Sequence, residues 1–317
     1  MTTREVDLRI AVAQAVLAPS SHNTQPWLFA VGDGVVELRA DRSRRLAVND
    51  PADRELTISC GAALLNLRCA LAAQGAATAV ELLPVPGDPD LLARVRVREA
   101  SPDPEDAALT AVVASRRTSR KPFGARSVPP AVWREVAGAA AVEGGSLVAV
   151  DTSERAALAE LVGEGDRAQF ADPQWRRELA GWLRPRRAGD GLSYPAPVAP
   201  VARFVVRSLD LGGRTAGSDR RLALTAPLLA VLTTGQDDPR GWLTAGLALE
   251  RALLVAAQHG VLAGFLNQPC QVDALRPRLR ELLSLEGHAQ LVLRLGFPTS
   301  EPSAAPRRPV QAVTLLR

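Results

Sequence analysis

The chain has 317 residues, of which 47% are hydrophobic and 23% are charged, a composition typical of a soluble globular protein with one large core or two fused domains. Its formal net charge of +4 comes almost wholly from arginine, since Lys121 is the only lysine. The basic residues form small clusters with few aromatic residues nearby, which argues against nucleic-acid binding, because that function needs a continuous basic face.

The first hundred residues alternate helical and strand-like patterns. Residues 4–18 have apolar side chains at helical spacing, and this start has no feature of a secretory signal. A polar turn follows, and then strand-like runs at 27–31 and 35–40 flank Gly32-Asp33-Gly34, a hairpin signal. No uncharged apolar run is long enough to span a bilayer, so we expect a cytoplasmic protein that is not inserted in a membrane.

A central helix is predicted after the hairpin. Asp50-Pro51 supplies a helix cap and a first-turn proline, and apolar residues at helical spacing continue to Gln74. Strands at 80–83 and 92–97 and a helix over 104–116 follow.

The second half repeats part of this order. Asp238-Pro239 begins another helix, which is apolar on all sides to Gln258 and therefore belongs in the middle of a fold. Both central helices open with Asp-Pro and close on Ala-Ala-Gln near a glycine, which favours an internal duplication over generic helix punctuation. Between them, residues 163–221 combine tryptophans with a proline-rich run and a glycine pair, and we predict an irregular lid there, with a disordered loop as the alternative.

Familiar enzyme signatures are absent from the sequence. There is no phosphate loop of the ATPase kind, no dinucleotide-binding glycine motif and no hydrolase elbow. Cys60, Cys69 and Cys270 and the three histidines have no ligand spacing, so we expect no metal site.

Three polar clusters remain. The first is Pro19–Trp27, whose hydroxyl and amide groups can donate to a phosphate or a sugar chain, although serine and asparagine also favour ordinary turns. The second is Arg116–Lys121, and the third is Arg307-Arg308 between two prolines. Paired guanidinium groups suit a phosphomonoester, whereas the alternative for each basic cluster is a solvated surface.

Together these clusters resemble the nitroreductase superfamily. A-P-S-S-H-N-T-Q-P-W at 18–27 resembles its flavin-contacting loop, R-R-T-S-R at 116–120 its phosphate and flavin signature, and L-V-L-R-L-G-F-P followed by P-R-R-P-V its C-terminus. The arginine signature follows the serine loop here instead of preceding it. This order is similar to the Acg-type branch, in which two nitroreductase-like halves are fused and mimic a dimer.

The resemblance implies an α+β fold with an antiparallel sheet sandwiched by helices, duplicated internally as a pseudo-dimer that would be a monomer in solution. The halves would be residues 1–100 and 101–317, with the lid at 163–221. It also implies flavin mononucleotide (FMN) as cofactor. The residues that it assigns to FMN are Ser20, Ser21, Asn23, Gln25, Arg116, Arg117, Thr118, Arg120, Asn267, Gln268, Arg307 and Arg308.

The implied function is an FMN-dependent oxidoreductase that transfers hydride through flavin N5 to or from a small molecule, with NAD(P)H as a candidate donor. No side chain stands out as a catalytic acid or base. The alternative is a protein that binds or sequesters FMN under a lid without ordinary turnover. A basic binding module without a cofactor is a third hypothesis.

Overall fold

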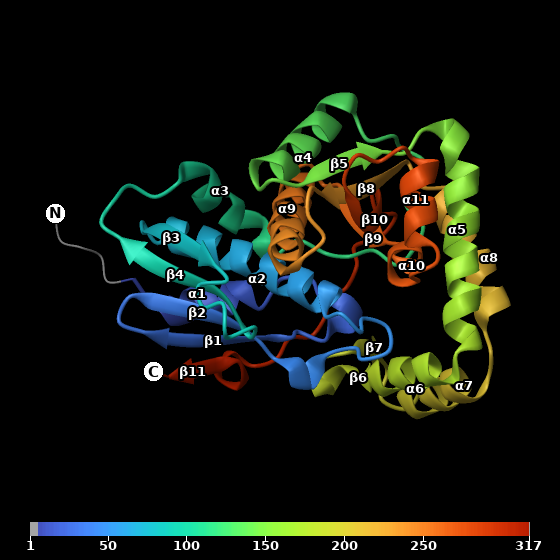
Figure 1. Cartoon of the computed structure of the whole chain (residues 1–317), viewed down its shortest axis with the longest axis horizontal. Coiled ribbons are helices and arrows are strands. Elements are labelled where there is room, and N and C mark those ends of the chain that lie inside the picture. Colours follow the sequence, from blue (N-terminus) through green and yellow to red (C-terminus); the bar gives the residue numbers. More distant parts are fainter. Residues whose placement is uncertain (1–5, 317) are drawn as a thin grey trace.

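The computed structural model describes residues 6–316, in which two main sheets have helices between and around them (Figure 1). The first sheet has the order β11-β1-β2-β4-β3, and the second has the order β5-β8-β10-β9. The strands of the first sheet are β1 (Trp27–Gly32), β2 (Val35–Ala40), β3 (Ala77–Leu82), β4 (Leu91–Arg98) and β11 (Thr314–Leu316). Those of the second are β5 (Ser146–Ala149), β8 (Leu228–Thr234), β9 (Leu262–Phe265) and β10 (His288–Gly296).

All neighbouring strands in both sheets are antiparallel except β1 and β11, which are parallel. The last strand of the chain therefore lies in the sheet of the first half, beside Trp27–Gly32. The predicted α+β class, with antiparallel sheets and helices around them, is confirmed, and the parallel pair of β1 and β11 is the one departure from the antiparallel pattern in these two sheets. The division at residue 100 and the internal duplication stay predictions.

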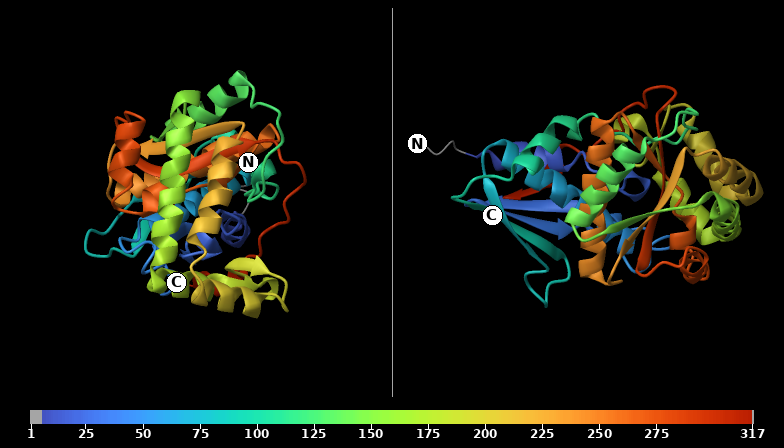
Figure 2. Two further views of the ribbon diagram at one scale, coloured as in Figure 1. Left: turned by 90° about the vertical axis from the view of Figure 1, so that its right-hand side faces the viewer. Right: turned by 90° about the horizontal axis from the view of Figure 1, so that it is seen from above.

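Helices fill the space between the sheets and cover their outer faces. They are α1 (Leu8–Ala15), α2 (Arg54–Ala73), α3 (Pro104–Val113), α4 (Pro130–Val142), α5 (Thr152–Ala171), α6 (Pro173–Trp182), α7 (Ala199–Ser208), α8 (Gly212–Leu224), α9 (Pro239–Gln258), α10 (Gln268–Gln271) and α11 (Arg276–Leu282). Seen from above, α9 stands between the two sheets (Figure 2). The two helices predicted to be central, α2 and α9, pack against each other there.

The contact between α2 and α9 depends on two glycines. A Cβ atom at Gly61 would lie 2.4 Å from the carbonyl oxygen of Leu243, and one at Gly246 would lie 2.1 Å from that of Ile58. Since both distances are far shorter than a van der Waals contact, the two backbones approach closely only because neither position has a side chain. Among the described residues, α2 is the one helix apolar and long enough to cross a bilayer by composition, but 89% of that stretch is buried inside the fold.

The predicted start of α2 at Asp50-Pro51 is wrong. The helix begins at Arg54, and Asp53 before it has a left-handed backbone with φ of 57°. Asp50 still serves the helix from a preceding turn, because its carboxylate accepts a hydrogen bond of 2.9 Å from the N–H of Leu56. An aspartate can thus satisfy a first-turn amide without standing at the cap position. The predicted start of α9 is confirmed, since Asp238 caps it.

The prediction that residues 163–221 are irregular is also wrong. Most of this stretch, called the lid segment below, lies in α5, α6, α7 and α8, with a small sheet of β6 (Leu183–Pro185) and β7 (Leu192–Tyr194) between α6 and α7. Two of its prolines, Pro173 and Pro200, stand in the first turn of α6 and α7, where a missing N–H costs nothing.

Candidate functional site

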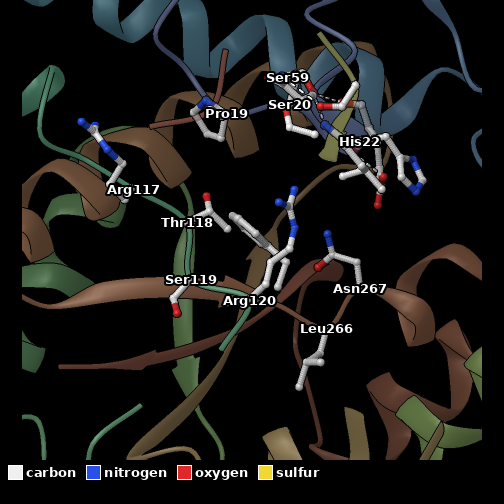
Figure 3. A pocket seen from close by; sticks show the side chains of 18 of the residues that line it. Pro19, Ser20, His22, Ser59, Arg117, Thr118, Ser119, Arg120, Leu266 and Asn267 are labelled. Carbon is white, nitrogen blue, oxygen red and sulfur yellow. Dashed lines mark hydrogen bonds between the residues drawn. The ribbon is translucent and has the colours of Figure 1, made fainter. Parts of the chain in front are cut away.

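A cavity of about 830 Å³ lies where several distant segments meet. The loop 19–23 and α2 contribute to its wall from the first half, and residues 116–120, 265–268 and 303–307 contribute from the second. Figure 3 shows Ser20, His22 and Ser59 on one side of this space and Leu266 and Asn267 across from them. Ten of the twelve predicted site residues line the cavity, and only Gln25 and Arg308 do not.

The loop between α1 and β1 has an unusual backbone. His22, Asn23 and Gln25 all have positive φ values, between 50° and 55°, which are costly for residues other than glycine. Hydrogen bonds hold the loop in this shape: the N–H of Gln25 donates to Ser20 Oγ at 3.0 Å, and the hydroxyl of Ser21 donates to Glu55. The loop thereby presents its hydroxyl groups on the cavity wall.

His22 is a neutral group in this wall. Burial lowers the pKa of its imidazole to about 4, and the charge of Arg120 acts in the same direction, although Glu55 opposes both. Its Nδ1 atom is buried and forms no hydrogen bond within residues 6–316. The side chain therefore offers the cavity a neutral polar atom at physiological pH.

The arginine motif at 116–120 places its members in different environments. Arg116 is 5% exposed and pairs with the buried carboxylate of Glu250 at 3.2 Å. Arg117 donates to the carbonyl oxygen of Arg116 at 2.9 Å and points away from the middle of the cavity (Figure 3). Arg120 points into the space between Thr118 and Asn267.

Arg120 forms no hydrogen bond or ion pair with any part of the chain that the structure describes. Desolvation by burial lowers the pKa of its guanidinium, and Tyr194 of the lid segment acts in the opposite direction. The backbone around it is fixed, because the N–H of Ser119 donates to Ala263 at 2.8 Å and Arg294 donates to Ser119 O at 2.8 Å. Hydrogen bonds of the neighbouring backbone thus hold in place an arginine that has no partner among the described residues.

Of the two C-terminal arginines, Arg307 lines the cavity, whereas Arg308 lies outside it and binds Gln25. Arg307 donates to the carbonyl oxygens of Leu17 and Ala18, at 2.9 and 3.1 Å, and to Asn23 Oδ1 at 3.1 Å. Burial and the charge of Arg116 lower the pKa of its guanidinium to about 9.

Gln25 and Arg308, which the resemblance assigns to FMN, do not line the cavity and bind each other instead. The N–H of Arg308 donates to Gln25 Oε1 at 2.8 Å, and its guanidinium donates to Gln25 O at 3.0 Å and pairs with Asp41 at 3.3 Å. Gln25 is fully buried. The pair anchors the C-terminal segment beside β1.

The opposite wall carries amides and carboxylates. Asn267 accepts from the N–H of Val292 at 3.0 Å, which fixes its side chain, and Gln268 donates to Asp166 and Asp219. Neither aspartate belongs to the three predicted polar clusters, because both lie in the lid segment. Glu55, in the first turn of α2, belongs to none of the predicted motifs, yet it accepts hydrogen bonds from Ser21 and Gln271 beside the cavity.

The lid segment closes one side of the cavity and is fastened to the first half. The carboxylate of Glu178 accepts from the N–H groups of Val48 and Asn49 at 2.9 and 2.8 Å, and Trp175 donates to Asn49 Oδ1 at 2.8 Å. Asp190 pairs with Arg44. Trp175 and Tyr194 of this segment line the cavity.

Among residues 6–316, no group of three or more His, Cys, Asp or Glu side chains could hold a metal ion. Cys60, Cys69 and Cys270 are all buried, and burial raises the pKa of each thiol, that of Cys270 to about 11.

Relatives match this chain over nearly its whole length. It is 32% identical over 307 residues to Rv3131 of Mycobacterium tuberculosis H37Rv, whose provisional name places it among the NAD(P)H nitroreductases, and the match covers 95% of this chain and 88% of the relative. It is 28% identical over 323 residues to Acg of the same strain, named in the same way, and that match covers 100% and 97% of the two chains.

The following two solved structures are less similar to this chain in sequence than these two relatives. The FMN-dependent nitroreductase NfnB from Mycobacterium smegmatis, in complex with NADPH, is 18% identical and matches 66% of this chain and 98% of its own at a TM-score of 0.46. Iodotyrosine deiodinase bound to FMN and 3-iodo-L-tyrosine is 14% identical, with 63% and 95% covered and a TM-score of 0.43. No protein-family model matches the chain.

Proposed function

Because this chain belongs to the NAD(P)H nitroreductase family, we propose that its cavity holds one FMN and that the protein moves electrons from NAD(P)H to a small-molecule acceptor. The observation that carries the proposal is the convergence of the polar motifs. Residues 20–23, 116–120, 267–268 and Arg307 are far apart in the sequence, yet they surround one cavity. A cofactor with a phosphate, a sugar chain and a flat ring needs such varied partners from several segments.

The arginines fit a phosphate group. Arg116 Nη1 and Arg307 Nε are buried and form no hydrogen bond within the described chain, and the charge of Arg116 disfavours the charged form of Arg307. A phosphomonoester would supply acceptor oxygens to these donors and would offset the positive charge. We therefore assign Arg116 and Arg307 to the phosphate end of FMN.

The remaining residues suit the rest of the cofactor. We assign the hydroxyl groups of Ser20 and Thr118 to the ribityl chain, and Arg120 to the oxygen atoms of the flavin ring. The bound flavin would supply the hydride chemistry. The protein would position it, keep a neutral His22 at its side and limit the access of water through the lid segment.

Anaerobic mixing with NADPH tests the activity. We expect the flavin absorbance of the FMN-loaded protein to bleach when NADPH is added and to return when a nitroaromatic acceptor follows. A protein that binds FMN but stays oxidised with both NADPH and NADH would contradict the oxidoreductase assignment.

The second candidate function is a protein that holds FMN without ordinary turnover. It is favoured by the fastening of the lid segment, in which Glu178 accepts two backbone N–H groups of the first half. Under this alternative, Glu178→Gln should speed the release of FMN and permit bleaching by NADPH that the unaltered protein does not show. Glu99→Gln, at an exposed position beyond β4, is the matched control.

A further inference from the structure

Two carboxylates from different helices meet at one wall of the cavity. Asp166 lies on α5 and Asp219 on α8, which run side by side (Figure 1). The side-chain amide of Gln268, at the start of α10, donates to both: Nε2 lies 3.0 Å from Asp166 Oδ1 and 2.8 Å from Asp219 Oδ2. All three side chains line the cavity.

The backbone holds this group together. A Cβ atom at Gly165 would lie 2.5 Å from the Cβ of Gln268, so α5 approaches α10 only because residue 165 has no side chain. Asp166 is 2% exposed. The two carboxylates are therefore built into the wall and are not a chance pair on a solvated surface.

Three acceptor oxygens of this group lack a donor. Asp166 Oδ2 and Gln268 Oε1 are buried without a hydrogen bond, and Asp219 Oδ1 has no donor among the described residues. Burial raises the pKa of both carboxyl groups, that of Asp166 to about 7 with a further contribution from the charge of Asp219. A buried acceptor without a partner is costly, so a ligand that donates here gains affinity.

The two nearby cations do not donate hydrogen bonds to these acceptor oxygens. Arg167 on α5 and Arg294 on β10 both favour the charged carboxylates, but neither forms an ion pair with them in the described chain. Arg294 donates instead to Ser119 O at 2.8 Å and Lys121 O at 3.1 Å, and Arg167 is exposed. The pKa values of both aspartates stay raised in spite of these two arginines.

Building on the proposed function, we infer that Asp166, Asp219 and Gln268 form a subsite for the primary ammonium group of a small-molecule substrate. A primary ammonium has three N–H donors, as many as there are oxygens without a donor in this group. Its positive charge would also relieve the repulsion between the two carboxylates. At low pH a proton on Asp166 would compete with this ligand.

Isothermal calorimetry with a matched pair of probes tests the subsite. At about pH 8, above the Asp166 pKa of about 7, 2-(4-nitrophenyl)ethylamine should bind roughly ten- to a hundredfold more tightly than 2-(4-nitrophenyl)ethanol, the gain of a charge-assisted contact. The preference should shrink at about pH 6, where Asp166 is mostly protonated. Equal binding of the two probes at pH 8 would overturn the inference.

Variants separate this subsite from general attraction of cations. The double variant Asp166→Asn with Asp219→Asn should abolish the preference for the amine. If the double variant does not fold, Asp219→Asn alone, at the less buried of the two positions, is the test, and it should reduce the preference. Glu160→Gln, an exposed acid on the same α5, should leave the preference intact. A preference that survives in a folded aspartate variant would also overturn the inference.

Quenching of flavin fluorescence, measured on the same samples, distinguishes this inference from the proposed function. If FMN binds and the amine shows no preference, only the ammonium subsite is wrong. If the amine preference holds and FMN does not bind, the subsite stands and the proposed function fails.

Discussion

Arg120 and Arg307 differ in how their guanidinium groups are already used. Arg120 has no hydrogen-bond or ion-pair partner in residues 6–316 and points into the cavity (Figure 3). Arg307 donates to the carbonyl oxygens of Leu17 and Ala18, yet its Nε remains buried without a partner. Both therefore retain donors for a ligand, whereas the donors of Arg308 are used by Gln25, Asp41 and Ala312.

These environments predict how the arginines contribute to FMN affinity. Arg120→Ala and Arg307→Ala should each weaken FMN binding by roughly ten- to a hundredfold, because each removes a charge-assisted contact of about 1.5–3 kcal/mol. Arg98→Ala, at an exposed position at the end of β4, is the control and should bind FMN normally. Titrations followed by flavin fluorescence measure the three dissociation constants, and denaturant melts check that each variant is folded. Equal losses in all three variants would indicate general electrostatic attraction instead of a site.

The sequence motifs located most of this wall but not the use of each side chain. Gln25 and Arg308 belong to the same motifs as their cavity-lining neighbours, and only the three-dimensional path of the C-terminal segment shows that they bind each other. Asp166 and Asp219 belong to no motif and approach only because α5 packs on α8. Contacts between helices distant in sequence leave no local pattern, so they could not be predicted.

At the scale of elements, the central contact is the crossing of α2 and α9. Both helices were predicted from their apolar residues and turn signals, and the all-round apolar pattern of α9 correctly placed it in the interior. The start of α2 was predicted too early, since an Asp-Pro pair is equally compatible with a turn before a helix. The helices of the lid segment were missed because proline and glycine mark helix ends as well as loops.

The close contact of α2 and α9 predicts that a single added methyl group lowers the stability of the fold. Gly246→Ala should lower the free energy of unfolding by at least about 1–3 kcal/mol, because its Cβ would lie 2.1 Å from the carbonyl oxygen of Ile58 and the two helices must separate. Gly138→Ala in α4 has no atom within 4 Å of its added Cβ and should raise stability by about 0.5–1 kcal/mol. Urea melts of both variants check this difference, and a neutral result at Gly246 would show that the helices are farther apart than described.

At the scale of the whole molecule, both central helices belong to one chain, so the contact between them needs no second copy of the protein. The α2–α9 interface is buried within a single polypeptide, and β11 returns from the end of the chain to the first sheet. We therefore predict a monomer near the chain mass of 33.6 kDa, since an apolar interface of this kind is already covered. Sedimentation equilibrium at micromolar concentration measures the mass, and a tight dimer would contradict the pseudo-dimer interpretation.

The asymmetry of the chain also limits the number of sites. The arginine motif occurs once, at 116–120, and its cavity uses the serine loop of the first half and Arg307 from the C-terminal segment. A symmetrical second cavity would need a second copy of these groups, which the sequence does not contain. We therefore expect one FMN for each chain.

The stoichiometry of FMN binding tests this account most directly. The folded protein, stripped of any bound flavin, is titrated with FMN while the quenching of flavin fluorescence is followed, and Arg120→Ala is titrated in parallel. The account predicts saturation at one FMN per chain, with weaker binding in the variant. Saturation at two per chain, or a folded protein that leaves the fluorescence unchanged, would contradict it.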